Sequence, residues 1–304
     1  MKTVVSVEKI TGGLNNQKMS ILGLIVEARK NDSIISIPDT LHDWTPTTEG
    51  RGTKFINIHE VYEMDELEKI IPVTNQKADK VLSFADCFAL GSQKIREEGG
   101  LPAEELVANE TARILSALRP VTDIQDEIDR LIGEMPEGTA GVQLRVERDW
   151  KNHLNSRRSR GIKLDLGREL VLDPRRIFQK IRNEDKEKNI TTLFLCCDED
   201  DLMQKKSEIS QMAGNFGFDV IFKSDVSSAF PESRLKRSLV DFGICLKLDT
   251  YIGLSLSTFS NLLCLTKSFE LKGKPNHFIY DAPGDVTVVR NDFGRFHSPA
   301  EIIR

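Results

Sequence analysis

The sequence lacks a long apolar run. In its 304 residues, no stretch approaches the ~18 consecutive apolar residues that a membrane-spanning helix requires. The first residues, MKTVVSVEKITGG, also lack the apolar centre of a secretory signal peptide. We therefore expect no membrane span. We expect a cytoplasmic location for the sequence as written, or a secretory lumen if a leader has been trimmed from it.

An excess of basic residues is missing too. The formal net charge is −5, from 42 lysines and arginines against 47 aspartates and glutamates. No aromatic-and-basic RNA motif is present, so nucleic acid is not expected as a partner. The apolar content of 39% and the charged content of 29% are those of an ordinary soluble globular protein. The length suits two domains of about 150 residues each.

Cysteine is scarce and irregularly placed. The five cysteines are odd in number and form no CxxC pair. They lie at positions 87, 196, 197, 245 and 264. This pattern predicts buried thiols in a reducing compartment.

What the sequence does contain is an apolar segment that runs into charge, TAGVQLRVERDWKN at residues 139–152. Residues 140–146 are apolar apart from Gln143 and Arg145, which predicts a buried strand with charges at its carboxyl end, where open α/β sheets bind ligands. An arginine in such a strand needs an anion for its guanidinium. Two interpretations remain open: Arg145 forms an ion pair with a carboxylate, or it clamps a phosphate with its planar set of donors.

A glycine-rich turn follows the first expected strand. Residues 3–7 are largely β-branched, the turn reads TGGLNNQ at 11–17, and apolar residues recur at helical spacing over 18–30. This order of strand, turn and helix N-terminus leaves backbone N–H groups pointing at a ligand. A plain connection, in which glycine supplies a positive φ, explains the same residues.

The second half alternates strands and helices, which predicts a second doubly wound sheet. A buried strand over 191–197 ends in Asp198 and three further acids. These acids suit a metal-dependent D-x-D site or a helix N-terminus favoured by the helix dipole, and we prefer the helix N-terminus for the last three. Further along, Ser257 and Thr258 are expected to open a helix, where hydroxyls and free N–H groups converge.

Three segments, in the same order, resemble motifs of the GDP-fucose protein O-fucosyltransferases and their plant-type and nodulation-type relatives. GGLNNQ is similar to the family's G-G-L-N-Q and G-R-F-G-N-Q. QLRVERDWKN is similar to H-x-R-x-x-x-D-W-K-N, and DTYIGLSLSTF at 249–259 is similar to A-D-x-F-I-G-N-x-x-S-[ST]-F. Together the matching parts cover the chain from residue 3 to about 269.

The resemblance implies an α/β fold of the GT-B-like type, with two Rossmann-like doubly wound domains facing across a cleft. We expect an acceptor-side domain over residues 1–155, completed by 285–304, and a nucleotide-sugar-binding domain over 160–284. The implied activity is transfer of fucose from GDP-fucose to a hydroxyl of a protein Ser/Thr or a glycan, with inversion. No metal ion and no other cofactor is implied.

The resemblance also implies the site residues. Arg145 and Asn16 would be catalytic, and Arg145 would stabilise the charge of the departing diphosphate. Asp198 and Asp249 would hold the guanine or ribose end. The substrate-binding residues implied are Gly12, Gly13, Leu14, Asn15, Gln143, Asp198, Asp249, Ser257, Thr258 and Phe259.

The chain departs from the family pattern at two positions. Gly13 stands where the G-R-F-G-N-Q form has arginine, and Gln143 stands where the family has histidine. Two alternatives therefore stay open: a glycosyltransferase of the same fold that uses another nucleotide sugar, and a non-catalytic nucleotide-sugar-binding protein. The candidates for a catalytic base are Asp39, His42, Glu147 and Asp149.

Overall fold

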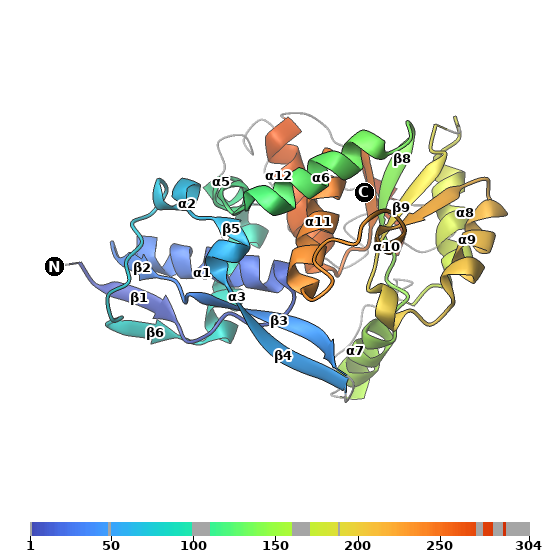
Figure 1. Ribbon diagram of the computed structural model, residues 1–304. Helices are drawn as coiled ribbons and strands as arrows, with labels where there is room; N and C mark the ends of the chain where they lie inside the picture. The colour runs from blue at the N-terminus through green and yellow to red at the C-terminus, as the bar shows by residue number, and fades with distance from the viewer. Residues whose placement is uncertain are drawn as a thin grey trace.

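The structure is a computed structural model of the chain, and it contains one parallel and one mainly parallel β-sheet with helices packed against them (Figure 1). Two short antiparallel pairs of strands accompany the sheets. The residues that it describes are 2–47, 50–98, 110–159, 171–187, 189–271, 276–281 and 288–289. No helix in these ranges is long and apolar enough to cross a membrane.

The smaller sheet has three parallel strands in the order β2-β1-β6. Its central strand β1, Val4–Val7, pairs with β2, Ile34–Ser36, and with β6, Lys80–Leu82. All three valines of β1 are buried. Helix α1, Leu14–Lys30, follows β1 through the glycine-rich turn and packs against β1 and β2.

Helix α3, Phe84–Glu98, crosses α1 at very short range. A Cβ atom at Gly23 of α1 would lie 1.7 Å from the Cys87 carbonyl oxygen, and one at Gly91 of α3 would lie 2.2 Å from the Met19 carbonyl oxygen. Both positions therefore require glycine. This backbone contact fixes the axis of α1, whose first turn carries expected site residues.

An antiparallel ribbon extends from the first half of the chain. Strands β3, Thr40–Thr47, and β4, Gly50–Asn57, pair along their whole length. The His42 N–H donates to the Ile10 carbonyl at 3.2 Å, which attaches β3 to the segment that follows β1. The other elements of this half are η1 (Ile58–Glu60), β5 (Tyr62–Glu63), α2 (Asp65–Glu68), α5 (Glu110–Ala117), β7 (Arg119–Pro120, paired with β5) and α6 (Thr122–Glu134).

The larger sheet has six strands in the order β10-β9-β8-β11-β12-β13. All of its pairings are parallel except the antiparallel pairing of β12 with β13. Its strands are β8 (Thr139–Gln143), β9 (Thr192–Cys196), β10 (Asp219–Phe222), β11 (Thr250–Gly253), β12 (Asn276–Ile279) and β13 (Val288–Val289).

The position of β8 corrects the expected domain boundary. We assigned this strand to a first domain of residues 1–155, but it is hydrogen-bonded to β9 and β11 inside the larger sheet. The change from one sheet to the other therefore falls before Thr139. Strand β13 of the expected 285–304 crossing also pairs in the larger sheet, and the rest of that segment lies outside the described residues.

Helices of the second half cover both faces of the larger sheet. Helices α8 and α9 share one core with β8 and β9, whereas α11 and α12 are buried in the same core as α1 and α6. In Figure 1, α11 and α12 accordingly lie between the two sheets. The elements are α7 (Arg148–Ser159), α8 (Pro174–Glu184), η2 (Glu199–Asp201), α9 (Lys206–Gly214), α10 (Lys223–Val226), α11 (Arg234–Lys247) and α12 (Thr258–Leu271).

The cysteines are free thiols. Four of the five are buried, as the sequence predicts, and Cys197 is half-buried. The Sγ atoms of Cys196 and Cys245 lie 3.2 Å apart, between β9 and α11. Burial raises the pKa of Cys196, so its thiol is protonated and unreactive at neutral pH.

Candidate functional site

Two expected site residues from the two ends of the chain meet in the structure. The Thr258 hydroxyl, at the start of α12, donates to Asn16 Oδ1 in the first turn of α1 at 2.9 Å. Helix α1 starts here because Gly12 adopts a φ of +81° and Gly13 caps the helix. The N-termini of α1 and α12 therefore lie side by side, and the first-turn N–H groups of a helix have no acceptor within it.

The carboxyl end of β8 is joined to the same helix start. The Ser260 hydroxyl, in the first turn of α12, donates to Gln143 Oε1 at 2.8 Å and accepts from the Leu254 N–H at 3.2 Å. The Gln143 side chain is buried, so its amide oxygen serves to hold α12 against β8. Asn16, Gln143 and Thr258 are thus brought together through α12.

Arg145 lies two residues beyond the end of β8, and not inside a strand as expected. The last pair of the β8–β9 ladder is Gln143 with Cys196, and the Leu144 N–H still donates to the Cys196 carbonyl at 3.0 Å. The Arg145 N–H then donates to the Tyr280 hydroxyl at 3.2 Å, and that hydroxyl donates to the Gln143 carbonyl at 2.9 Å. Tyr280 therefore fixes the backbone that carries Arg145.

The Arg145 side chain is held over the first turn of α7. Its Nη1 lies 3.3 Å from Glu147 Oε1, its Nη2 lies 3.6 Å from Asp149 Oδ1, and its Cζ lies 5.0 Å from the centre of the Trp150 ring. The side chain remains 22% exposed. The ion-pair interpretation of Arg145 is therefore met in the structure. The phosphate-clamp interpretation remains open beside it, because the side chain keeps some exposed surface.

Glu147 is a buried carboxyl in contact with two expected site residues. Its side chain is 1% exposed, and its Oε1 accepts from Arg145 Nη1 and, at 3.1 Å, from the Asp198 N–H. Its Oε2 has no hydrogen-bond partner among the described residues. Burial raises the pKa of Glu147 to about 7, although Arg145 and the backbone donors act to lower it. Glu147 is therefore about half ionised at neutral pH.

Asp198 follows β9 at the same end of the larger sheet. Its Oδ2 accepts from Arg234 Nη1, at the start of α11, at 2.8 Å. The neighbouring Leu235 N–H donates to Asp43 Oδ1 of β3 at 3.0 Å. The ribbon of the first half therefore caps a helix of the second half beside Asp198.

The three acids after Asp198 each have their own protein contact. Asp201 Oδ2 accepts from the Asp149 N–H at 2.9 Å, so it caps the N-terminus of α7. Glu199 accepts from the Ser224 N–H at 3.1 Å and pairs with Lys206, and Asp200 lies 3.6 Å from Arg234. Contrary to expectation, the run does not open the helix that follows it, because Glu199–Asp201 form η2 and α9 begins only at Lys206; Asp201 caps α7 instead. Within the described ranges, no group of three or more His, Cys, Asp or Glu residues is placed to hold a metal ion.

Of the three residues at the start of α12, Thr258 alone is seen to reach across to α1. The Ser257 hydroxyl accepts from the Phe259 N–H at 3.1 Å and so caps the helix. The Phe259 ring packs against Phe242 and Tyr251, with ring centroids 5.4 and 6.4 Å apart. The side chains of Ser257 and Phe259 therefore support the helix start.

The glycine-rich turn before α1 offers a ligand mainly backbone groups and few side chains. Leu14 is buried in the core, and Asn15 is buried with its Oδ1 unpartnered in the described part of the chain. A Cβ atom at Gly13 would meet no atom within 4 Å. There is therefore space for a Cβ atom at Gly13, but glycine supplies no side chain where the G-R-F-G-N-Q form has arginine.

Asp249 lies at the wrong end of the larger sheet. It is exposed and precedes β11, whose first residue, Thr250, is level with Ala140 near the start of β8. Gln143 and Arg145 lie at and beyond the other end of β8. The length of a strand therefore separates Asp249 from the other residues, and this contradicts its expected place in the nucleotide site.

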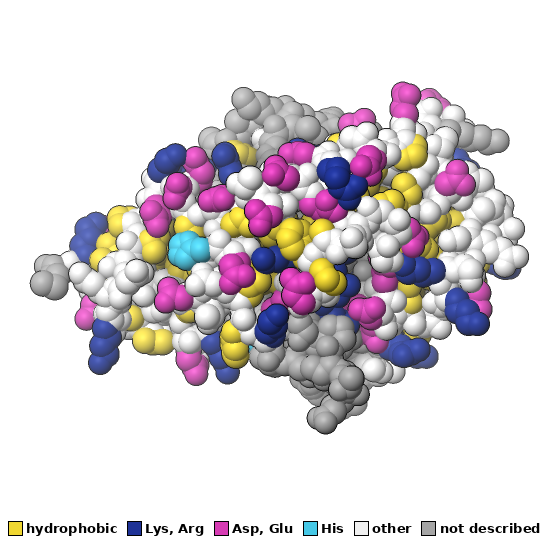
Figure 2. Space-filling view, viewed as in Figure 1, with side chains coloured by type: hydrophobic (Ala, Val, Ile, Leu, Met, Phe, Trp, Pro, Cys, Tyr) yellow, Lys and Arg dark blue, Asp and Glu magenta, His cyan; other side chains and the backbone are white. Residues whose placement is uncertain are grey.

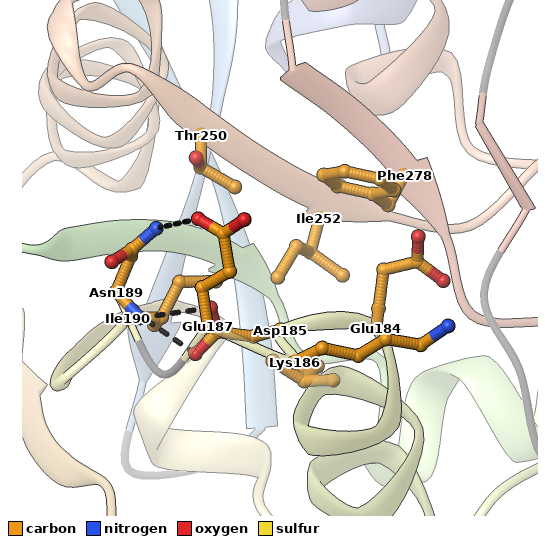
Figure 3. A pocket seen from close by; sticks show the side chains of 10 residues that line it. Glu184, Asp185, Lys186, Glu187, Asn189, Ile190, Thr250, Ile252 and Phe278 are labelled. Atoms are coloured by element: carbon orange, nitrogen blue, oxygen red, sulfur yellow. Dashed lines mark hydrogen bonds between the residues drawn. The ribbon is translucent and has the colours of Figure 1, made fainter.

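A cavity of about 360 Å³ opens at this opposite end (Figure 3). Two of its three acids are engaged by their own turn: Asp185 accepts from the N–H groups of Asn189 and Ile190, and Glu187 accepts from the Asn189 amide. The residues that line it are Ile181, Glu184, Asp185, Lys186, Glu187, Asn189, Ile190, Thr250, Ile252 and Phe278. The cavity contains none of the expected site residues.

Three positioning residues carry no signal that would reveal their role in sequence. Asp43 and Arg234 act through partners about 190 and 36 positions away, and Tyr280 acts on Gln143 and Arg145 from the end of β12. A tyrosine after an expected strand is too common to single out. Glu147, by contrast, is among the residues that the sequence offers as candidates for a catalytic base.

Comparison with known proteins supports the resemblance. No family model matches the sequence. O-fucosyltransferase 23 from Arabidopsis thaliana is 27% identical over 146 residues, which are 45% of this chain and 31% of that protein. The matched region thus spans about a third of that relative's length.

Solved structures share the fold over nearly the whole chain. POFUT1 in complex with GDP matches with a TM-score of 0.60 at 13% identity, covering 91% of this chain and 98% of that one. POFUT1 in complex with GDP-fucose gives a TM-score of 0.60 at 12% identity, with 95% and 98% covered. The fucosyltransferase NodZ from Bradyrhizobium gives a TM-score of 0.52 at 14% identity, with 95% and 99% covered.

These matches confirm the GT-B-like α/β fold expected from the sequence. The sequence relative is named an O-fucosyltransferase, NodZ is named a fucosyltransferase, and the two POFUT1 structures contain GDP or GDP-fucose. The resemblance that the three motifs indicate is thus supported by a sequence relative named an O-fucosyltransferase, and the solved structures show that the fold is shared.

Proposed function

We propose that this protein transfers fucose from GDP-fucose to a hydroxyl group of a protein Ser/Thr or a glycan acceptor. One observation carries the proposal: the three motif segments converge through two hydrogen bonds. These bonds join Asn16 to Thr258 and Gln143 to Ser260, across 242 and 117 positions of sequence. Arg145 follows Gln143 by two residues, at the carboxyl end of the larger sheet, where sheets of this class bind ligands.

The proposed reaction breaks the bond between C1 of fucose and the diphosphate oxygen. Negative charge then develops on the departing diphosphate, and positive charge develops on the sugar. The Arg145 guanidinium and the N–H groups at the starts of α1 and α12 are fixed donors that stabilise this diphosphate more in the transition state than in the ground state. The acceptor oxygen attacks the opposite face of C1, which gives inversion.

Charge stabilisation in this proposal needs no metal ion. Arg145 is cationic at all relevant pH values, and the carboxylates of Glu199 and Asp201 are engaged by Lys206 and by the N-terminus of α7. GDP-fucose is therefore proposed as the donor substrate without a metal or other cofactor.

A second candidate function is favoured by the two departures from the family motifs. Gly13 supplies no side chain, and the oxygen of Gln143 is occupied by Ser260. A protein that binds a nucleotide sugar without turning it over would have the same fold and the same helix starts. The release of free fucose from GDP-fucose, with water as the acceptor, separates this candidate from an enzyme.

The decisive experiment is therefore a GDP-fucose hydrolysis assay combined with thermal shift. We expect slow fucose release and a higher Tm with GDP and GDP-fucose than with UDP-sugars, because a ligand that binds only the folded state stabilises it. Arg145→Ala should abolish release and weaken the shift, whereas Arg175→Ala, an exposed arginine on α8, should change neither. A Tm shift without release would support the binding protein, and a preference for UDP-sugars would support another donor.

A further inference from the structure

Glu147 lies next to Arg145, so an anion that binds to Arg145 would lie close to the negative charge of the Glu147 carboxylate. Its Oε1 lies 3.3 Å from Arg145 Nη1, so a phosphate that takes Arg145 must compete with this carboxylate. Its other oxygen, Oε2, is buried and has no hydrogen-bond partner within the described residues. A buried carboxylate oxygen without a donor is costly when ionised, but it can carry a proton.

We propose that Glu147 takes up a proton when the diphosphate of a nucleotide binds to Arg145, so that nucleotide binding at this site is coupled to the protonation of one buried carboxyl. This inference rests on the proposed function, because it takes the diphosphate to Arg145. It goes beyond that function by stating that Glu147 is protonated when the site holds the nucleotide.

The charges around Glu147 favour this coupling. Arg145 is the cation that faces it, and acidic or neutral groups face it from the other elements. These are Asp149 on α7, Cys197 and Asp198 after β9, and Tyr280 after β12. A diphosphate adds negative charge and draws the guanidinium toward itself, and both changes favour the neutral form of Glu147.

The proton balance of the step is simple. One proton passes from a buffer acid to Oε2 of Glu147, where an O–H bond forms, and no bond of the nucleotide is made or broken. Oε1 continues to accept from the Asp198 N–H, so the tip of β9 stays in place. Burial already raises the pKa of Glu147 to about 7, and a modest further rise therefore suffices to hold the proton at neutral pH.

The test is calorimetric titration of the full chain with GDP in two buffers of different ionisation enthalpy. At pH 7.5 we expect the uptake of roughly half to three-quarters of a proton per GDP bound, because a carboxyl with a pKa of about 7 is already partly protonated in the free protein. Across pH 7.0 to 8.5 the Kd should rise by roughly tenfold, since an acid that is protonated only in the complex weakens binding as pH rises through its free pKa.

Two variants assign the proton. Glu147→Gln keeps an acceptor for the Asp198 N–H and is neutral at every pH, so its GDP binding should show no proton uptake and a flat pH profile over this range. Glu134→Gln, an exposed carboxylate on α6, should behave as the wild type. The ionisation of the terminal phosphate, with a pKa of about 6, is common to all three proteins and cancels in the comparison.

Each outcome decides a separate point. GDP binding without proton uptake in the wild type overturns the inference and leaves the proposed function standing. Proton uptake that persists in Glu147→Gln assigns the proton elsewhere and also overturns it. No GDP binding at all overturns the inference together with the proposed function. If Glu147→Gln does not fold, the absence of proton uptake in the wild type still overturns the inference, and a wild-type Kd that rises between pH 7.0 and 8.5, above the phosphate pKa of about 6, supports it.

Discussion

At the scale of single residues, Arg145 and Glu147 depend on each other. The guanidinium lowers the pKa of a carboxyl that burial raises, and the carboxylates of Glu147 and Asp149 keep the guanidinium over the Trp150 ring. Removing one partner of a buried pair leaves the other charge uncompensated. Glu147 can escape this cost by taking up a proton, whereas Arg145 cannot lose one.

The stability of the protein should therefore depend on Glu147 in a defined pH window. The native pKa, about 7, lies above the value of 4.5 for the unfolded chain, so the native state binds more protons between these values. The contribution of this group to the free energy of unfolding falls as pH rises from ~4.5 to ~7, by up to roughly 3 kcal/mol. Below ~4.5 and above ~7 it is constant.

Glu147→Gln removes this titration. The stability of the variant relative to the wild type should therefore increase as pH rises from ~5 to ~7.5, and then level off. Urea denaturation of both proteins at several pH values measures the difference. A difference that does not change with pH would show that Glu147 has an ordinary pKa in the folded protein.

At the scale of elements, the start of α12 organises the site. Its cap residue Ser257, its first residue Thr258 and its first-turn Ser260 contact the Phe259 N–H, Asn16 and Gln143 respectively. The two helix N-termini that the Thr258–Asn16 hydrogen bond joins are suited to an anion, because each contributes a helix dipole and N–H groups without an acceptor in the helix.

Ser257→Ala combined with Thr258→Ala should weaken GDP binding by roughly 1–3 kcal/mol, through lost donors to a charged group and a looser helix start. When Arg145→Ala is added, the losses should not sum, because all three residues act on one ligand group. Isothermal titration of the variants checks this, with Ser207→Ala on the exposed side of α9 as the control. Strictly additive losses would place the diphosphate away from α12.

The acidic run around η2 gives a separate prediction. Fucose release should survive EDTA, because the proposed stabilisation of the leaving group comes from Arg145 and the helix starts. Asp200→Asn should leave the rate unchanged, since Asp200 is half exposed and lies 3.6 Å from Arg234. A strict requirement for manganese or magnesium that disappears in Asp200→Asn would show that the run is a metal site.

At the scale of the whole molecule, α11 and α12 join the two sheets. Both helices follow strands of the second half, yet they are buried in the same core as α1 and α6. The first half also caps α11 through Asp43. Acidic and basic side chains are intermixed on the face shown in Figure 2, so the surface on this side shows no large field of one sign.

A nucleotide that binds at the helix starts should stabilise both halves at once. In hydrogen–deuterium exchange, GDP should slow exchange in the first turns of α1 and α12 together. Asn16→Ala removes the acceptor of the Thr258 hydroxyl and should reduce the protection of both turns. Protection confined to α12 would mean that α1 takes no part in binding.

The sequence by itself determined the fold class and the segments that form the site. Alternating strand and helix patterns, with glycine at the turns, are local features that hydrophobic periodicity reveals. The motif resemblance correctly grouped Asn16, Gln143 and Thr258, and the apolar surroundings of the cysteines indicated their burial. The extent of the expected strand over 140–146 was wrong: β8 ends at Gln143, level with Cys196 at the end of β9.

Only the tertiary structure decided to which sheet β8 belongs, at which end of the larger sheet Asp249 lies, and what surrounds Glu147. Strand order and direction depend on pairings between residues 50 to 110 positions apart, and no local pattern specifies them. The charge state of Glu147 depends on its burial between β8, β9, β12 and α7, because desolvation and neighbouring charges set a pKa. The same glutamate in an exposed turn would be a solvated surface charge.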